Sequence, residues 1–460
     1  MEQLEKNNKM AEMPIKKLML AMGVPMIISM VLQALYNIVD SAFISNMAQN
    51  GEAALNALTL AFPFQMLMVA IGIGTGIGTN VLVAKNLDLG DKERASRAAG
   101  NAQFLAAIIY LIFLLFGIFG VRFYISTQTS NQTIYDMAVS YLRICCIISP
   151  GVIFFAIYEK LLQAAGHSMY STIAQIAGAL TNIILDPIMI YGWLGCPKLG
   201  VKGAAFATVI GQCVSWLLAL VFHFKVNETI SKKIQYLRPS AEVIKRIYAV
   251  GLPAIIAQAL MSVMTYGLNI ILVSVSEAMV TAYGLFYKIQ QFILFAAFGL
   301  RDAITPIISF AYGMGNKKRI RDGIKYGILY TLIIMLIGTI AAEVFAGPFA
   351  AVFSLSGETE AAFVSAMHII SISFLFAGIN IALQGVFQAL NRGLASLTVS
   401  LGRQLIFILP VAWGFAQIVL NSQTSGWIIW ITFPFAEIVT AGIACFLMQK
   451  IDKKIIAADK

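Results

Sequence analysis

The residues best suited to ion chemistry in this 460-residue chain lie inside long apolar stretches. Asp40 stands more than twenty residues after Leu18, where the first apolar stretch begins, and Asn37 and Tyr36 precede it by about one helical turn. Gln33 lies two turns before Asp40 on the same helix face, since side chains three or four positions apart align. A charged side chain at the middle of a membrane helix costs about 2.5–3.5 kcal/mol. The pattern therefore predicts a polar stripe around Asp40 that faces the protein interior.

A second polar group occupies the fifth and sixth apolar stretches. Asn182 and Asp186 are spaced i, i+4, which directs both side chains to one helix face, and Thr208 follows in the next stretch. Carboxylates brought close together favour sharing a proton, and carboxylate, amide and hydroxyl oxygens also suit a small hard cation. We therefore predict a site for H⁺ or Na⁺. Two structural alternatives stay open: Asp40 as a helix cap near the outer surface, and Asp186 as part of a kink at Pro187.

The other charged residues within apolar stretches have simpler explanations. Glu437 is expected to form a structural ion pair, with Lys288 or Arg403 as its partner. Arg301 and Asp302 are adjacent and predict a local pair. His368 stands on an apolar helix and is expected to be a packed histidine.

The elements that must position these residues are membrane helices. Hydrophobic residues make up 59% of the chain and charged residues 12%, whereas a soluble domain carries roughly 25% charged residues. A helix needs about 20 residues to cross the hydrocarbon layer. The sequence predicts an all-α integral membrane protein with twelve transmembrane helices, near 18–45, 55–84, 98–120, 137–159, 170–193, 203–224, 247–273, 278–312, 324–346, 362–389, 395–420 and 426–449.

Lysine and arginine are distributed unevenly between the two sides of these helices. Of the 32 basic residues, twenty-six fall on the side of the termini, including Lys160 and Arg403, and three fall on the other side. Basic residues favour the cytoplasmic side, so we expect a multi-pass protein of the cell membrane with both termini in the cytoplasm. The net charge of +10 then reflects topology, and no nucleic-acid partner is expected.

The chain also contains an internal repeat. Gly90-Asp91-Lys92-Glu93-Arg94 and Gly315-Asn316-Lys317-Lys318-Arg319 lie 225 residues apart, as do Gln163-Ala164 and Gln388-Ala389. The repeat predicts two pseudo-symmetric six-helix bundles, residues 1–225 and 241–460, joined by a cytoplasmic linker at 226–240. Six helices per half give both halves the same orientation in the membrane.

The sequence resembles the multidrug and toxic compound extrusion (MATE) family, and within it the MepA-like branch. Motifs along nearly the whole chain carry this resemblance: Gly23-Val24-Pro25, Tyr36-Asn37-Ile38-Val39-Asp40, the Gly-rich segment 72–78, Gln163-Ala164-Ala165-Gly166, Asn182 to Asp186-Pro187, Gly200-Val201-Lys202-Gly203-Ala204-Ala205, and Tyr312-Gly313-Met314-Gly315-Asn316-Lys317-Lys318-Arg319.

The resemblance implies cation-coupled export, by alternating access between the two lobes, of amphipathic and often cationic compounds. It implies a proton or sodium site in the N-terminal lobe at Asp40, Asn182, Asp186 and Thr208, and a hinge at Pro25. The C-terminal lobe lacks the acids that other branches carry in the seventh and tenth helices, which argues against a second ion site. The alternative within the superfamily is a flippase for lipid-linked saccharides, which requires a cleft rich in Arg or Lys.

Substrate contacts are assigned from the helices expected to border a central cleft. They are Tyr36, Asn37, Phe62, Gln65, Met66, Met264 and Phe286. We expect small drugs or organic cations and membrane lipid as partners, no cofactor besides the coupling ion, no enzymatic activity, and a monomer.

Overall fold

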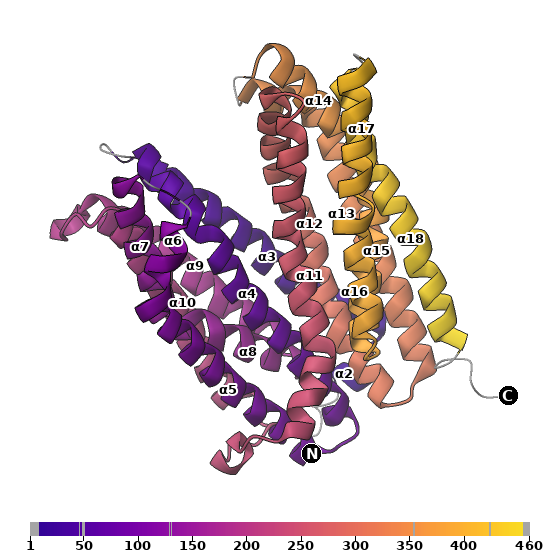
Figure 1. Ribbon diagram of the computed structural model, residues 1–460. Coiled ribbons are helices and arrows are strands. Elements are labelled where there is room, and N and C mark those ends of the chain that lie inside the picture. The colour runs from indigo at the N-terminus through magenta and orange to yellow at the C-terminus, as the bar shows by residue number, and fades with distance from the viewer. Residues whose placement is uncertain are drawn as a thin grey trace. The chain divides into compact units, whose positions relative to one another are not determined.

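The computed structural model describes residues 9–45, 47, 51–127, 129, 131–352, 355–422 and 425–453. Every regular element in these ranges is a helix (Figure 1), which confirms the all-α prediction. In this part of the chain ten helices are long and apolar enough to cross a membrane, and two bent pairs bring the number to twelve.

Contacts divide the helices into two compact units. Unit 1 comprises Met1–Ala11 and Ile28–Ile255, and unit 2 comprises Glu12–Ile27 and Ile256–Lys460. The elements that lie within unit 1 are α4 (Gly51–Asp88), α5 (Lys92–Leu115), η1 (Phe116–Gly120), α6 (Val121–Ser126), α7 (Gln132–Ile147), α8 (Pro150–Ala164), α9 (Ser168–Tyr191), η2 (Trp193–Gly195), α10 (Val201–Val226) and η3 (Ile234–Leu237). Those that lie within unit 2 are α12 (Glu277–Gly313), α13 (Lys317–Val352), α14 (Gly357–Ser371), α15 (Phe374–Ala389), α16 (Gly393–Leu401), η4 (Gly402–Ile406), α17 (Leu409–Ser422), η5 (Gly426–Ile431) and α18 (Thr432–Ile451).

Three helices contain a boundary between the units. The short α2 (Lys9–Glu12) ends at one, and α3 (Ile15–Ser45) and α11 (Ala241–Val273) each pass from one unit to the other. The boundaries in the two long helices follow Ile27 and Ile255, each two residues after a proline inside the helix, Pro25 in α3 and Pro253 in α11. The predicted lobes, 1–225 and 241–460, follow chain order, whereas the compact units follow contacts. The lobe boundaries stay a prediction.

The two halves repeat one another in their irregularities. The fourth predicted span is bent by 45° between α7 and α8, and the tenth is bent by 53° between α14 and α15. Helices α7 and α14 begin at Gln132 and Gly357, 225 positions apart, and they reach their breaks after 16 and 15 residues. The sequence predicted each of these spans as one unbroken helix. The first break precedes Pro150, and the residue before a proline is disfavoured in helical conformation.

The predicted linker is attached to the surface of unit 1. Asn101, on α5, accepts a hydrogen bond from the backbone N–H of Ser240 at 2.7 Å, and its amide donates to the carbonyl of Arg238 at 3.3 Å. Ser96, one turn earlier, accepts a bond from the N–H of Ser231 at 2.7 Å. Both α5 side chains are buried. The segment 226–240 therefore runs along α5 as an ordered strap.

Candidate functional site

Small residues bring α9 and α10 into close contact. A β-carbon added at Gly178 would lie 2.4 Å from the carbonyl oxygen of Gly211, and one added at Gly203 would lie 2.3 Å from that of Met189. In lipid, such close backbone approach is a main source of helix association. The contact fixes the polar face of α9 against α10.

The predicted residues of α9 and α10 are buried at this contact. Asp186 is fully buried, Asn182 is 2% exposed and Thr208 is 8% exposed. The amide nitrogen Nδ2 of Asn182 donates to Oδ1 of Asp186 at 3.4 Å, as the i, i+4 spacing predicts. Asn182 Oδ1 and Thr208 Oγ1 have no hydrogen-bond partner among the described residues. A buried oxygen without a partner costs about 1–3 kcal/mol, so this group is suited to receive a donor or a cation.

Asn182 and Thr208 line a cavity of about 110 Å³ inside unit 1. Its wall combines apolar side chains with the polar side chains of Gln33, Glu159, Lys160, Gln175, Gln212 and Ser215. A cavity of this size accommodates a hydrated ion or a few water molecules. The arrangement provides a small polar chamber beside a buried carboxylate.

Sequence reasoning missed a buried charged cluster in the wall of this cavity. Lys160 is 2% exposed and Glu159 is 8% exposed. Lys160 Nζ lies 3.9 Å from Glu159 Oε1, and Gln163 bridges them by accepting from Lys160 at 3.0 Å and donating to Glu159 at 2.9 Å. The charge count places Lys160 on the side of the termini, and the sequence did not predict that its side chain is buried. The sequence could have indicated this cluster, because Glu159 and Lys160 are adjacent residues of opposite charge inside a predicted span.

Asp40, Asn37 and Tyr36 lie in α3, but their side chains fall outside the described residues. The path of α3 nevertheless sets the level of Asp40. Before it, Gln175 of α9 donates to Gln33 at 3.2 Å, and after it, Tyr191 of α9 donates to the carbonyl of Phe43 at 2.5 Å. These contacts join residues 142 and 148 positions apart, so α3 and α9 run in the same direction.

The stretch of α9 from Gln175 to Tyr191, which includes Asp186, therefore lies along the stretch of α3 that includes Asp40. Ser29, which also contacts Gln175, is consistent with this register. Asp40 and Asp186 thus stand on neighbouring helices, and their membership of one site stays a prediction.

The residues assigned to the substrate cleft differ in burial. Phe62 is 52% exposed, and Gln65 is half-buried and donates to the hydroxyl of Tyr141 at 3.4 Å. Met66 is also half-buried. Met264 and Phe286 are buried in the hydrophobic core of unit 2, at 8% and 0% exposure. Because both side chains pack in this core, the structure does not support their assignment to the substrate cleft.

Glu437 is buried in unit 2 in an ion pair with Arg403, whose Nη2 and Nε lie 2.7 and 3.0 Å from Oε1. Asn380 donates to Oε2 at 2.7 Å, so both carboxylate oxygens have partners. This confirms the predicted structural pair, with Arg403 as the partner and buried beside Glu437. Arg301 pairs with Asp302 at 3.0 Å, also as predicted.

The prediction for His368 is wrong. Its ring nitrogen Nδ1 lies 2.5 Å from Oε2 of Glu343, and the two side chains are 45% and 39% exposed. Ser371, one turn further on α14, donates to the other oxygen of Glu343 at 2.7 Å. The apolar pattern of the helix gave no sign of the glutamate, because Glu343 comes from α13.

The chain is similar to known sequences and structures over nearly its full length. The sequence model of the MatE family matches residues 25–188 and again residues 253–413. "Multidrug export protein MepA" of Staphylococcus haemolyticus is 24% identical, covering 96% of this chain and 95% of that protein. The protein of the same name from Staphylococcus aureus is 26% identical, covering 86% of each.

The fold is also that of a solved transporter. A structure described as an outward-facing conformation of a multidrug resistance MATE family transporter of the MOP superfamily superposes with a TM-score of 0.90. It is 24% identical, and the match covers 98% of this chain and 99% of that one. The twelve-helix, two-lobe architecture is thereby established, and the two successive family matches agree with the internal repeat.

Proposed function

Because the chain belongs to the MatE family, we propose that it is a multidrug efflux antiporter of the cell membrane, coupled to H⁺ or Na⁺. It exports amphipathic, often cationic compounds by alternating access between its two lobes. The names of the MepA relatives support the export of drugs. The coupling ion is proposed on the chemistry of the chain itself.

One observation carries the coupling proposal. Asn182 Oδ1 and Thr208 Oγ1 lack partners among the described residues, are buried, and face a cavity next to the fully buried carboxylate of Asp186. Oxygen donors of this kind fit a proton held by the carboxylate, or a sodium ion. Lys160 also lines the cavity, and its charge opposes a bound cation. Glu159 offsets that charge, so the wall adds little net repulsion.

Coupling requires that ion and substrate stabilise different states of the protein. In this proposal, protonation or ion binding at Asp40 and Asp186 favours one arrangement of the half of α3 that follows Pro25. Substrate favours the other, so the two ligands weaken one another's binding reciprocally. Pro25 is a natural hinge because proline removes one helical hydrogen bond and disturbs the preceding turn.

The flippase alternative receives less support from the charges. A lipid-linked polyanion needs several cations in the transport path. The guanidinium of Arg301 is engaged with Asp302, and that of Arg403 with Glu437. Among the described residues, Lys288 is the one basic side chain deep in a C-terminal span that has no ion pair with an acid. Its side chain is exposed.

Vesicles loaded with a fluorescent cationic dye test the proposal. The purified protein is reconstituted, and efflux is followed under an imposed proton gradient or an imposed sodium gradient. We expect one of the two gradients to accelerate efflux, and Asp186→Asn to abolish that acceleration while the protein still inserts. Dye movement that is equally fast with no gradient, or unaffected by Asp186→Asn, would contradict the proposal.

A further inference from the structure

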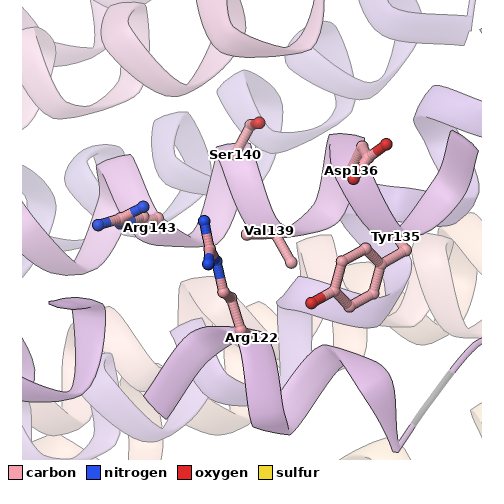
Figure 2. Close-up of a pocket in the computed structure, with 6 residues that line it drawn as sticks. All are labelled: Arg122, Tyr135, Asp136, Val139, Ser140 and Arg143. Atoms are coloured by element: carbon pink, nitrogen blue, oxygen red, sulfur yellow. The ribbon is translucent and has the colours of Figure 1, made fainter. Parts of the chain in front are cut away.

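A second cavity lies in unit 1 between α6 and α7, away from the residues of the proposed cation site. It has a volume of about 450 Å³ and is lined by Arg122, Tyr135, Asp136, Val139, Ser140 and Arg143. Figure 2 shows these six side chains: Arg122 reaches from α6 toward the other five, which belong to α7. Five of the six are polar, which is unusual for a cavity beside membrane-spanning helices.

The sequence of α7 directs these side chains to one face. Asp136, Val139, Ser140 and Arg143 follow the i, i+3, i+4, i+7 spacing of a helical stripe. In Figure 2 the guanidiniums of Arg122 and Arg143 lie toward one end of the group and the Asp136 carboxylate toward the other, while the Tyr135 hydroxyl points toward Arg122. The cavity therefore has a basic end that also offers a hydroxyl group.

The two arginines have no anionic partner within the described part of the chain. Among the described residues no ion pair or hydrogen bond involves either guanidinium, and Asp136 accepts a bond from Gln132 at 3.1 Å. Two like charges on one cavity repel each other. An anion held between them would relieve this repulsion.

We propose that this basic end binds a negatively charged phosphate group. The planar guanidinium matches phosphate oxygens with two parallel hydrogen bonds, and the hydroxyl of Tyr135, which points toward Arg122 in Figure 2, is available as a further donor. Arg122 stands four residues before Ser126, where its span ends, which at 1.5 Å per residue is about 6 Å along the helix. This is the depth of lipid headgroups, so an anionic phospholipid is one source of the phosphate, and free phosphate is the other.

The test uses the full-length protein purified in detergent. Retention of phosphatidylglycerol and of phosphatidylcholine is measured by native mass spectrometry, and binding of inorganic phosphate is measured by calorimetry. We expect Arg122→Gln with Arg143→Gln to weaken retention of the tightest phosphatidylglycerol at least about tenfold, because charge-assisted hydrogen bonds are lost. If free phosphate is the ligand, the same variant loses phosphate binding instead.

A matched double variant, Arg94→Gln with Arg97→Gln, removes the same charge from α5, where both arginines are exposed and paired with nearby acids. It should leave binding unchanged. Arg143→Lys keeps the positive charge but loses the planar guanidinium that can donate two parallel hydrogen bonds. It should give intermediate binding at an unchanged melting temperature. Binding of both ligands that is untouched by the α6 and α7 variant, or equally reduced by the α5 variant, would overturn the proposal. In that case the arginines only extend toward the membrane surface.

Discussion

Asp186 is fully buried and accepts a hydrogen bond from the amide of Asn182, one turn away on the same helix. Burial of a charged carboxylate is expensive unless a cation or proton compensates it. Neighbouring Thr208 contributes an oxygen but no charge. The two residues should therefore differ in how much their loss affects transport.

We expect Asp186→Asn to lower gradient-driven efflux at least about tenfold, since it removes the only charge on α9 that can hold the ion. Thr208→Ala should lower it about fivefold, the effect of one hydrogen bond worth about 1 kcal/mol. Initial rates of dye efflux at matched protein content measure both. An equal and small loss in the two variants would show that the carboxylate does not bind the coupling ion.

Glu437 should matter for stability rather than for coupling. Removing one partner of a buried ion pair costs about 3–5 kcal/mol, and Glu437→Gln leaves Arg403 buried without its counter-charge. Glu242→Gln is the matched control, because the pair of Glu242 with Arg246 is exposed and such pairs contribute about 0–1 kcal/mol. Melting in detergent should fall clearly for the first variant and little for the second. A stable Glu437→Gln protein that has lost ion coupling would assign Glu437 to the transport mechanism.

The sequence indicated the pair of Asn182 and Asp186 because helical spacing alone aligns them. It did not indicate Glu159, Lys160 or the Glu343–His368 contact, because those depend on which helices pack together. The same limit applies to Met264 and Phe286: an apolar side chain on a membrane helix has the same pattern whether it faces a cleft, lipid or the core.

At the scale of elements, hydropathy and the 225-residue repeat were sufficient to predict every span, but not the breaks within two of them. A proline such as Pro150 marks one break, whereas the equivalent break after Ser371 has no proline. The close contact of α9 with α10 was not predicted, because the sequence does not show which helix packs against the glycines that make it.

Gly178→Ala tests that contact. A methyl group there would meet the carbonyl of Gly211 at 2.4 Å and the hydroxyl of Ser215, and crowding of this kind costs about 1–3 kcal/mol. We expect a lower melting temperature and weaker ion binding. Gly442→Ala on α18 has nothing within 4 Å of the added carbon and should change neither. Normal ion binding by the Gly178 variant would show that the α9–α10 contact does not shape the site.

Pro25→Ala tests the hinge in α3. With the missing hydrogen bond restored, the helix should bend less readily, so ion binding is expected to survive while substrate release and net efflux fall. Pro348→Ala in α13 is the control, since this proline lies inside one unit. Unchanged efflux and unchanged competition between drug and ion in the Pro25 variant would make the proline a packing feature.

At the scale of the whole molecule, the orientation in the membrane rests on the distribution of basic residues. Removing the buried Lys160 and Arg403 from the count leaves twenty-four on the side of the termini against three on the other. The asymmetry is therefore preserved, and it predicts that the loop after α9 faces outward.

Cys196 in that loop is exposed and serves as a natural probe. In a Cys445→Ser background, an impermeant maleimide should label Cys196 in intact cells, and Cys196→Ser should abolish the signal. Lys232→Cys, placed in the strap along α5 of the doubly substituted protein, should react only after the membrane is permeabilised. The reverse pattern of labelling would invert the assigned topology.

The most direct test of the account is whether a substrate gradient alone moves the coupling ion. Proteoliposomes are loaded with a cationic drug and diluted into drug-free buffer with no ion gradient, while internal pH and sodium are recorded by fluorescence. Coupling through the buried site predicts that drug efflux drives H⁺ or Na⁺ inward in the wild-type protein, and that Asp186→Asn abolishes the ion movement. Drug efflux at the normal rate without movement of either ion would contradict it.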